Sequence, residues 1–311
     1  MLVIVPHMFI HDPYADYEVF ILPYVFGCSL DEFPERGLVG NESPTRNPIA
    51  WWLRCLSFQT TGYPNAFLMP FSALIIPLVY YLGYYLTNDR LIGTMSMFAM
   101  VFNPYYSNWT TTGTYDQIWS FFLLLSIVLL YKSTGKSFVS YLIAILAKTN
   151  ALLYFPLWLY SVKKIKDDWE GMIFGFCIIA LLASAVIYFG FAEKAIGSSI
   201  GFFPENLEKA AVRNISLFWP IIPLLLGLLV WNNAFKAKDA PKNKKLVAIW
   251  IITIFIMTPL IHIFTNQLTF PYRYVPLAAF MSILISQVIV ETGTFRKENL
   301  ARIKELRRVS L

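Results

Sequence analysis

The chain of 311 residues is 57% hydrophobic, 17% aromatic and 14% charged, and its mean hydropathy is +0.55. A soluble domain carries about 25% charged residues, so this composition excludes a soluble globular protein and predicts an integral membrane protein. The net charge of +6 arises from basic residues in short loops between apolar runs, which is typical of membrane proteins and argues against nucleic-acid binding. We expect one all-α transmembrane domain over residues 1–311, a polytopic bundle of about seven to nine membrane helices.

The N-terminal part is predicted to lie mostly outside the membrane. Residues 1–10 are apolar but shorter than the ~20 residues that cross a bilayer, and we interpret them as the outer end of a first helix. Residues 11–65 are predicted to form a long first extracytoplasmic loop, with an amphipathic helix around Trp51–Arg54 lying on the membrane surface. For Cys28 and Cys55 in this loop we expect two free thiols, with a disulfide bond as the alternative in an oxidising compartment.

Three carboxylates, those of Asp12, Asp16 and Glu18, follow the apolar start of the chain. Because Asp12 and Asp16 are spaced i, i+4, a helix would put both on one face. One interpretation is a general base or a metal ligand at the outer membrane surface. The other is a solvated helix N-terminus, where the helix dipole favours acids. Both interpretations stay open on these residues alone.

Several later apolar runs approach the length needed to cross a ~30 Å hydrocarbon core. The predicted spans are 66–86, 91–106, 116–131, 170–192, 215–231, 246–264 and 274–293. Residues 138–162 form either one span or a hairpin of two short helices broken at Lys148–Asn150. The hairpin puts most of the 25 basic residues on one side of the membrane, whereas a single crossing divides them. We therefore predict the hairpin, whose tip reaches membrane depth inside the protein.

Three residues beyond the first loop are candidate site residues. Asp116 opens a span on the same outer face as the acidic cluster, although alone it is more typical of a helix-end acid. Lys148 is costly at membrane depth, by ~2.5–3.5 kcal/mol, and is either a snorkelling lysine or a phosphate contact. Arg273 lies between two tyrosines and is either an interfacial anchor or a second phosphate ligand. Residues 296–311 are predicted to form a basic cytoplasmic tail on the inner leaflet.

This arrangement resembles the GT-C superfamily of integral membrane glycosyltransferases, which carry an acidic motif in the first outer loop and often a second acid in the next. Asp16-Tyr17-Glu18-Val19-Phe20 resembles the motif of GPI mannosyltransferase I. In contrast, His11-Asp12-Pro13-Tyr14 and Gly113-Thr114-Tyr115-Asp116 resemble the catalytic subunit of oligosaccharyltransferase. The resemblance covers roughly residues 11–162. It departs from the oligosaccharyltransferase pattern at Ile118, where an acid is expected, and in lacking a Trp-Trp-Asp motif.

The resemblance implies a hexosyltransferase, such as a mannosyltransferase, that moves a sugar from a polyprenyl-phosphate carrier such as dolichol phosphate. The acceptor would be a glycan, a lipid or a protein on the extracytoplasmic face. Asp16 or Asp12 would act as the general base and Asp116 would orient the acceptor. Lys148 and Arg273 would bind the phosphate. We expect no cofactor, with a divalent metal held by Asp12 and Asp116 as the alternative.

The expected surroundings are membrane lipids, in the plasma membrane of a prokaryote or the endoplasmic reticulum of a eukaryote. A membrane-protein partner near the N-terminus is a further option, and no nucleic-acid partner is expected. Two alternatives remain for the function: a non-catalytic GT-C-like subunit or scaffold of a larger complex, and an oligosaccharyltransferase-like enzyme. A transporter is disfavoured, because the spans hold almost no ionisable residues apart from Lys148 and His262.

Overall fold

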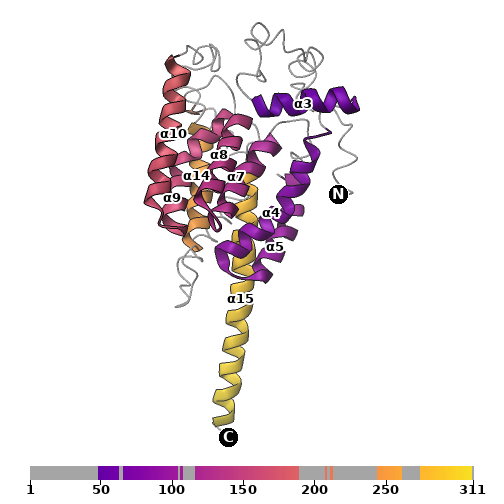
Figure 1. Ribbon diagram of the computed structural model, residues 1–311. Helices are drawn as coiled ribbons and strands as arrows, with labels where there is room; N and C mark the ends of the chain where they lie inside the picture. The colour runs from indigo at the N-terminus through magenta and orange to yellow at the C-terminus, as the bar shows by residue number, and fades with distance from the viewer. Residues whose placement is uncertain are drawn as a thin grey trace.

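Helices make up the part of the chain that the computed structural model describes (Figure 1). This part covers residues 48–62, 66–103, 106–107, 116–188, 207–208, 211–212, 244–260 and 274–309. Its main helices are α3 (Pro48–Thr61), α4 (Met69–Thr87), α5 (Arg90–Val101), α7 (Asp116–Leu130), α8 (Thr134–Ala147), the 3-10 helix η4 (Thr149–Tyr154), α9 (Phe155–Ile165), α10 (Trp169–Tyr188), α14 (Lys244–Leu260) and α15 (Val275–Val309). These ranges contain no strand, and the expected all-α fold is confirmed.

Most of the predicted membrane spans coincide with these helices, and the polytopic helical bundle is confirmed. Within the described ranges, Met69–Thr87 and Val275–Gly293 are long and apolar enough to cross a membrane, and five shorter apolar helices accompany them. At 1.5 Å per residue the shorter helices measure about 18–24 Å, less than the ~30 Å of a hydrocarbon core. The predicted span at 215–231 lies outside the described residues.

α4 and α5 form a close antiparallel pair that depends on two glycines. Asn88, with a φ of 57°, reverses the chain, and the Asp89 carboxylate accepts backbone N–H groups at the start of α5. A Cβ on Gly93 would lie 2.8 Å from the Tyr80 carbonyl oxygen, and one on Gly83 would lie 3.2 Å from the Gly93 Cα. Small residues are the usual means by which membrane helices approach this closely.

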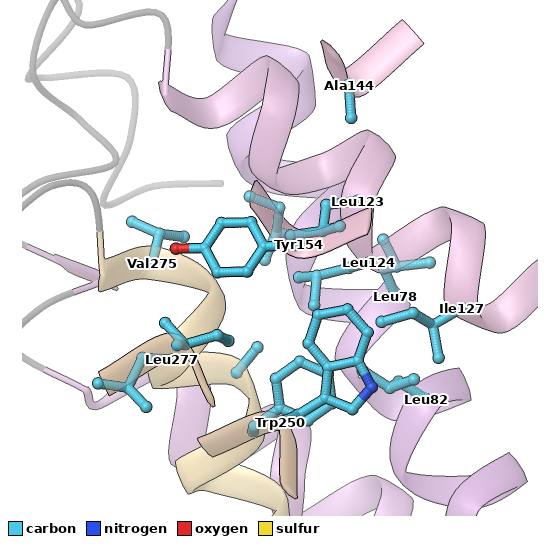
Figure 2. Close-up of a cluster of buried hydrophobic side chains, with 14 of the residues drawn as sticks. Leu78, Leu82, Leu123, Leu124, Ile127, Ala144, Tyr154, Trp250, Val275 and Leu277 are labelled. Carbon is cyan, nitrogen blue, oxygen red and sulfur yellow. The ribbon is translucent and has the colours of Figure 1, made fainter. Parts of the chain in front are cut away.

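The hydrophobic core lies where α4, α7, α14 and α15 meet the segment from α8 to α9. Figure 2 shows part of this cluster, in which apolar side chains from these elements meet around Trp250. The Trp250 ring stacks on Phe280 with centroids 5.1 Å apart, and its indole N–H donates to Ser161 Oγ at 3.0 Å. The buried Trp158 indole similarly donates to Ser137 Oγ at 2.9 Å. These aromatic groups therefore fill the core with their polar atoms satisfied.

α10 presents large apolar side chains to the outside of the bundle. Those most exposed are Trp169, Ile173, Phe174, Phe176, Leu181 and Leu182. A contiguous apolar face of this kind is rare on soluble monomers. On a helix beside a membrane bundle it is the expected surface for contact with lipid acyl chains.

Residues 138–162 form the predicted hairpin rather than one span. α8 ends at Ala147, and Lys148 takes an extended conformation with φ −158° and ψ 116°. The chain then turns through η4 and resumes as α9, which carries a proline in its first turn. The structure thus confirms the break at Lys148 that the charge distribution favoured.

The predicted basic tail continues the last helix, and its place on the inner leaflet stays a prediction. α15 runs without a break from Val275 to Val309 and extends beyond the bundle (Figure 1). A single glycine costs a helix only about 1 kcal/mol relative to alanine, so Gly293 does not end it. The tail is also rich in Lys, Arg, Glu and Leu, which all favour the helix.

At the corner between α9 and α10, one carboxylate joins α8 to α10. Asp168 accepts a hydrogen bond from Thr134 Oγ1, at the start of α8, at 2.5 Å. It also accepts the Gly171 backbone N–H at 2.8 Å and so caps α10. On the other side of the corner Lys163 pairs with Asp167, and its ammonium group lies 4.1 Å from the Trp169 ring centroid.

Gly171→Ala is expected to lower the free energy of unfolding by about 1–3 kcal/mol through overpacking. The new Cβ would lie 2.6 Å from both Asp168 Oδ2 and Thr134 Cγ2. Denaturant unfolding of the purified protein in detergent measures the change. Gly293→Ala is the control, because no atom lies within 4 Å of its Cβ and alanine favours the helix. Equal stability of the two variants would contradict the tight corner.

Stability at this corner should also depend on pH. Hydrogen bonds from Thr134 and from the Gly171 backbone, with Lys166 nearby, lower the pKa of Asp168. A carboxyl group with a lowered folded-state pKa stabilises the fold above its unfolded-state pKa of about 3.9, and this contribution is lost as the pH falls through the folded-state pKa. The wild type should therefore exceed Asp168→Asn in stability at about pH 5–7, and this difference should shrink below about pH 4. Unfolding curves across this range test it, and a difference that persists in acid would contradict it.

Candidate functional site

The sequence-predicted site residues divide into those that the structure describes and those that it does not. Asp12, Asp16 and Arg273 lie outside the described residues, so their positions stay predictions. Asp116 is the first residue of α7, and Lys148 separates α8 from η4. The geometry of the candidate site is therefore built from the backbones at these two positions.

α7 and α8 run antiparallel and bring Asp116 and Lys148 to the same end of the bundle, called here the site end. Ser140 Oγ donates to the Phe122 carbonyl oxygen at 2.8 Å, which sets the register between the two helices. From this contact, at 1.5 Å per residue, Asp116 lies about 9 Å along α7 and Lys148 about 12 Å along α8. The start of α7 and the break in the hairpin therefore lie at nearly the same level.

Lys148 is buried, with 3% of its surface exposed. Its backbone N–H donates to the Ala144 carbonyl oxygen, and its own carbonyl accepts the Ala151 N–H, both at 2.9 Å. A snorkelling lysine keeps its ammonium group in water. The burial of Lys148 therefore argues against the snorkelling interpretation and places its side chain inside the protein.

Tyrosine hydroxyls hold the segment after Lys148 in place. Tyr141 of α8 donates to the Ala151 carbonyl oxygen at 2.5 Å. Tyr154, at the end of η4, shares a hydrogen bond of 3.1 Å with Thr258 of α14. The Tyr154 ring also stacks on Trp119 of α7, with centroids 6.0 Å apart. Contacts from three helices thus fix η4 beside Lys148.

α3 lies across the site end (Figure 1), and it packs against α8. Its inward face carries Ala50, Arg54 and Ser57, all with 0% of their surface exposed. Its outward face carries Trp52 and Leu56, which are half exposed. The arginine therefore lies on the inward face of the helix, while Trp52 and Leu56 lie on its outward face.

Sequence reasoning had not identified Arg54 as a site residue. The sequence predicted only an amphipathic helix around this position. Charged residues on such a helix usually face water. The signal available was the i, i+4, i+7 spacing of Ala50, Arg54 and Ser57, which places the three on one face. Only the packing of α3 against α8 shows that this face points inward.

Cys55, next to Arg54, is disulfide-bonded, which corrects the expectation of two free thiols in this loop. Its partner lies outside the described residues. Cys55 is 3% exposed, so its own side chain is buried on α3. Cys177 of α10 is free and exposed.

Among the described residues, no group of three or more His, Cys, Asp or Glu side chains could hold a metal ion. Because Asp12 lies outside those residues, the alternative of a metal held by Asp12 and Asp116 stays a prediction. The described part of the site end instead contributes two cationic side chains, those of Arg54 and Lys148.

Two solved structures share this fold, both of ArnT from Cupriavidus metallidurans. The chain matches ArnT bound to undecaprenyl phosphate with a TM-score of 0.51 and 14% identity, covering 82% of this chain and 53% of that one. The match to apo ArnT has a TM-score of 0.52, 14% identity and coverage of 82% and 52%. No protein-family model matches the sequence, and no curated protein matches it.

The likeness to ArnT concerns the fold, and it confirms the polytopic helical bundle that the sequence predicted. The chain spans about half the length of ArnT. At 14% identity the correspondence of individual residues is not established.

Tyr141→Phe is expected to loosen the hairpin tip, because the buried Ala151 carbonyl loses the donor that Tyr141 supplies. The loss should cost about 1–3 kcal/mol and should speed amide hydrogen exchange across η4. Tyr81→Phe, on the exposed face of α4, is the matched control and should leave exchange unchanged. Equal exchange rates in the two variants would show that this hydrogen bond does not hold the tip.

Proposed function

We propose that this protein is a membrane glycosyltransferase that transfers a sugar from a polyprenyl-phosphate carrier to an acceptor on the extracytoplasmic face. The main support is the arrangement of the site end, where the start of α7 at Asp116 and the buried Lys148 share one level. The fold supports it as well, because one of the two ArnT structures that share it is bound to undecaprenyl phosphate.

The proposed reaction is a direct displacement at the anomeric carbon of the sugar. An acceptor hydroxyl oxygen attacks the anomeric carbon and forms the new glycosidic bond. The bond between the anomeric carbon and the carrier phosphate oxygen breaks, and its electron pair leaves with the phosphate. Asp16 or Asp12 takes the proton of the acceptor hydroxyl as general base. Asp116 orients the acceptor. The products are the glycosylated acceptor and the free polyprenyl phosphate.

Fixed cations serve the departing phosphate in this proposal. Lys148 is a point-charge partner for phosphate, and its burial keeps its field unscreened by water. Arg273 is proposed as a second ligand of the same phosphate. With these charges the transfer needs no metal, and we favour a metal-free inverting reaction. A metal-dependent version would use Asp12 and Asp116 as ligands.

The positions of the cysteine and of the basic loops support an extracytoplasmic site. Disulfide bonds such as that of Cys55 form in oxidising compartments, and α3 lies at the site end. The turns at the opposite end carry Lys132, Lys136 and Lys163–Lys166, as expected for cytoplasmic loops. We place the protein in a prokaryotic plasma membrane or a eukaryotic endoplasmic reticulum.

Asp16→Asn is expected to abolish sugar transfer while leaving expression and folding intact, because the acceptor loses its base. The measurement is turnover of radiolabelled polyprenyl-phosphate sugars by membranes that contain the full chain. Asp12→Asn is made alongside, and Glu170→Gln, an exposed acid at the opposite end, is the matched control. Transfer at the wild-type rate in both aspartate variants would remove the aspartate-base assignment. Absence of transfer in the wild type with any carrier would favour the non-catalytic scaffold.

A further inference from the structure

The last helix continues well past the rest of the bundle and carries a concentration of charge there. α15 runs from Val275 to Val309, and its apolar, membrane-spanning part ends at Gly293. We propose that residues 294–309, called here the extension, form a docking helix for a cytoplasmic partner protein whose surface is acidic and partly apolar. This inference goes beyond the proposed function and does not depend on sugar transfer.

A contact inside the bundle fixes the level at which the extension begins. α15 runs away from the end where α3 lies (Figure 1), whereas α5 runs back toward that end after the turn that follows α4. Ser282 of α15 and Met100 of α5 lie at one level, because Ser282 Oγ is 3.8 Å from Met100 Sδ. Gly293 and Arg90 each lie about 15–17 Å further from the site end, at 1.5 Å per residue. The extension therefore begins level with the turn between α4 and α5.

Most of the extension stands clear of the membrane surface. Because α15 is unbroken at Gly293, the extension continues along the axis of the span. Arg296 then lies about 4–5 Å beyond Gly293, and Arg308 about 22 Å beyond it. The headgroup layer is only about 5–8 Å thick on each side, so Arg296 falls at the leaflet. Arg308 lies about 14 Å beyond the headgroups, further than the Debye length of about 8 Å at physiological salt.

Helical register separates the charges of the extension. Successive residues are about 100° apart around a helix, so the sector of each position follows from its number. Both acidic positions, Glu298 and Glu305, fall outside the sector of about 120° in which most of the basic positions gather. A helix with its cations on one side is electrostatically complementary to an acidic surface. The basic sector contains Arg296, Lys297, Lys304, Arg307 and Arg308.

Apolar positions adjoin this basic sector. Leu300, Ile303 and Leu306 are three residues apart and share a second sector of about 120°. Apolar anchors on one side of a helix are typical of a helix that binds in a groove of another protein. RNA offers phosphates to the cations but no groove in which the apolar positions are buried. The two sectors together therefore favour a protein partner that is both acidic and partly apolar.

A second copy of this chain does not provide such a surface at this end. In the described turns there, basic residues outnumber acidic ones, and most of the acids already serve the bundle. Asp89 caps α5, Asp168 caps α10, and Asp167 pairs with a lysine. A second copy would bring the same basic turns and the same basic sector, and like charges repel. The partner is therefore a different protein.

The experiment measures binding of labelled calmodulin, a probe with the proposed chemistry, to the full chain in phosphatidylcholine nanodiscs. Calmodulin is an acidic protein that binds basic amphipathic helices, and Ca²⁺ opens its apolar groove. Removing Ca²⁺ with a chelator closes the groove and leaves an acidic protein. Comparison of the two states therefore separates burial of the apolar positions from charge attraction alone.

Three variants locate the binding surface. The charge variant of the extension combines Lys304→Glu, Arg307→Glu and Arg308→Glu. The matched control makes the same change in net charge at exposed lysines of the same end, with Lys132→Glu, Lys136→Glu and Lys166→Glu. The apolar variant combines Ile303→Gln and Leu306→Gln. Thermal unfolding of each variant reports its folding.

The wild type should bind calmodulin at least about tenfold more tightly with Ca²⁺ than without it. The charge variant should lose about tenfold or more of this affinity, and the apolar variant about fivefold or more. The control should stay within about threefold of the wild type, because its lysines lie outside the extension. If the charge variant does not fold, Arg307→Gln with Arg308→Gln takes its place, and a severalfold loss is expected.

Four outcomes overturn the proposal. The first is absence of calmodulin binding by the wild type, and the second is an equal loss in the charge variant and the control, which would show that net charge alone governs binding. The third is an RNA oligonucleotide that binds as tightly as calmodulin, which would make the extension a general polyanion binder. The fourth is loss of calmodulin binding in nanodiscs rich in phosphatidylserine, which would show that the extension lies on anionic lipid.

Discussion

A helix that ends inside a membrane protein exposes carbonyl and amide groups that water does not reach, and the site end of this bundle depends on how those groups are bonded. The break at Lys148 meets this constraint within a few residues. Its backbone bonds to Ala144 and Ala151, and the Tyr141 hydroxyl reaches the Ala151 carbonyl. Because nearby residues supply these hydrogen bonds to the backbone, the chain can reverse its direction inside the bundle and bury the Lys148 side chain there.

α3 completes the site end from outside the bundle. It brings a second buried cation, Arg54, to the site end and turns Trp52 and Leu56 outward. A disulfide bond at Cys55 attaches the same helix to another part of the chain. The electrostatic character of the described site end thus depends on a tertiary contact between a transverse helix and an interrupted one.

Sequence reasoning predicted the features that are set by local composition. Apolar run lengths located α4, α7 and α10, and the distribution of basic loops distinguished a hairpin from a single crossing at Lys148. It did not identify Arg54. Whether an amphipathic helix turns a charged side chain inward depends on the elements that pack against the helix, and the sequence does not show these. The predicted span at 274–293 agrees with the apolar part of α15, which continues as a helix to Val309 because a change from apolar to basic composition does not break a helix. The positions of the acidic cluster and Arg273 remain predictions.

The hydrogen bonds of the hairpin also determine how this protein can move. Thr134 and Ser137, in the first turn of α8, are bonded to Asp168 and Trp158, and Tyr141, near the middle of α8, is bonded to Ala151 of η4. Tied at these points, α8 and α9 are expected to move as one rigid body. A carrier lipid would then have to reach the site end beside this hairpin and not between its two helices.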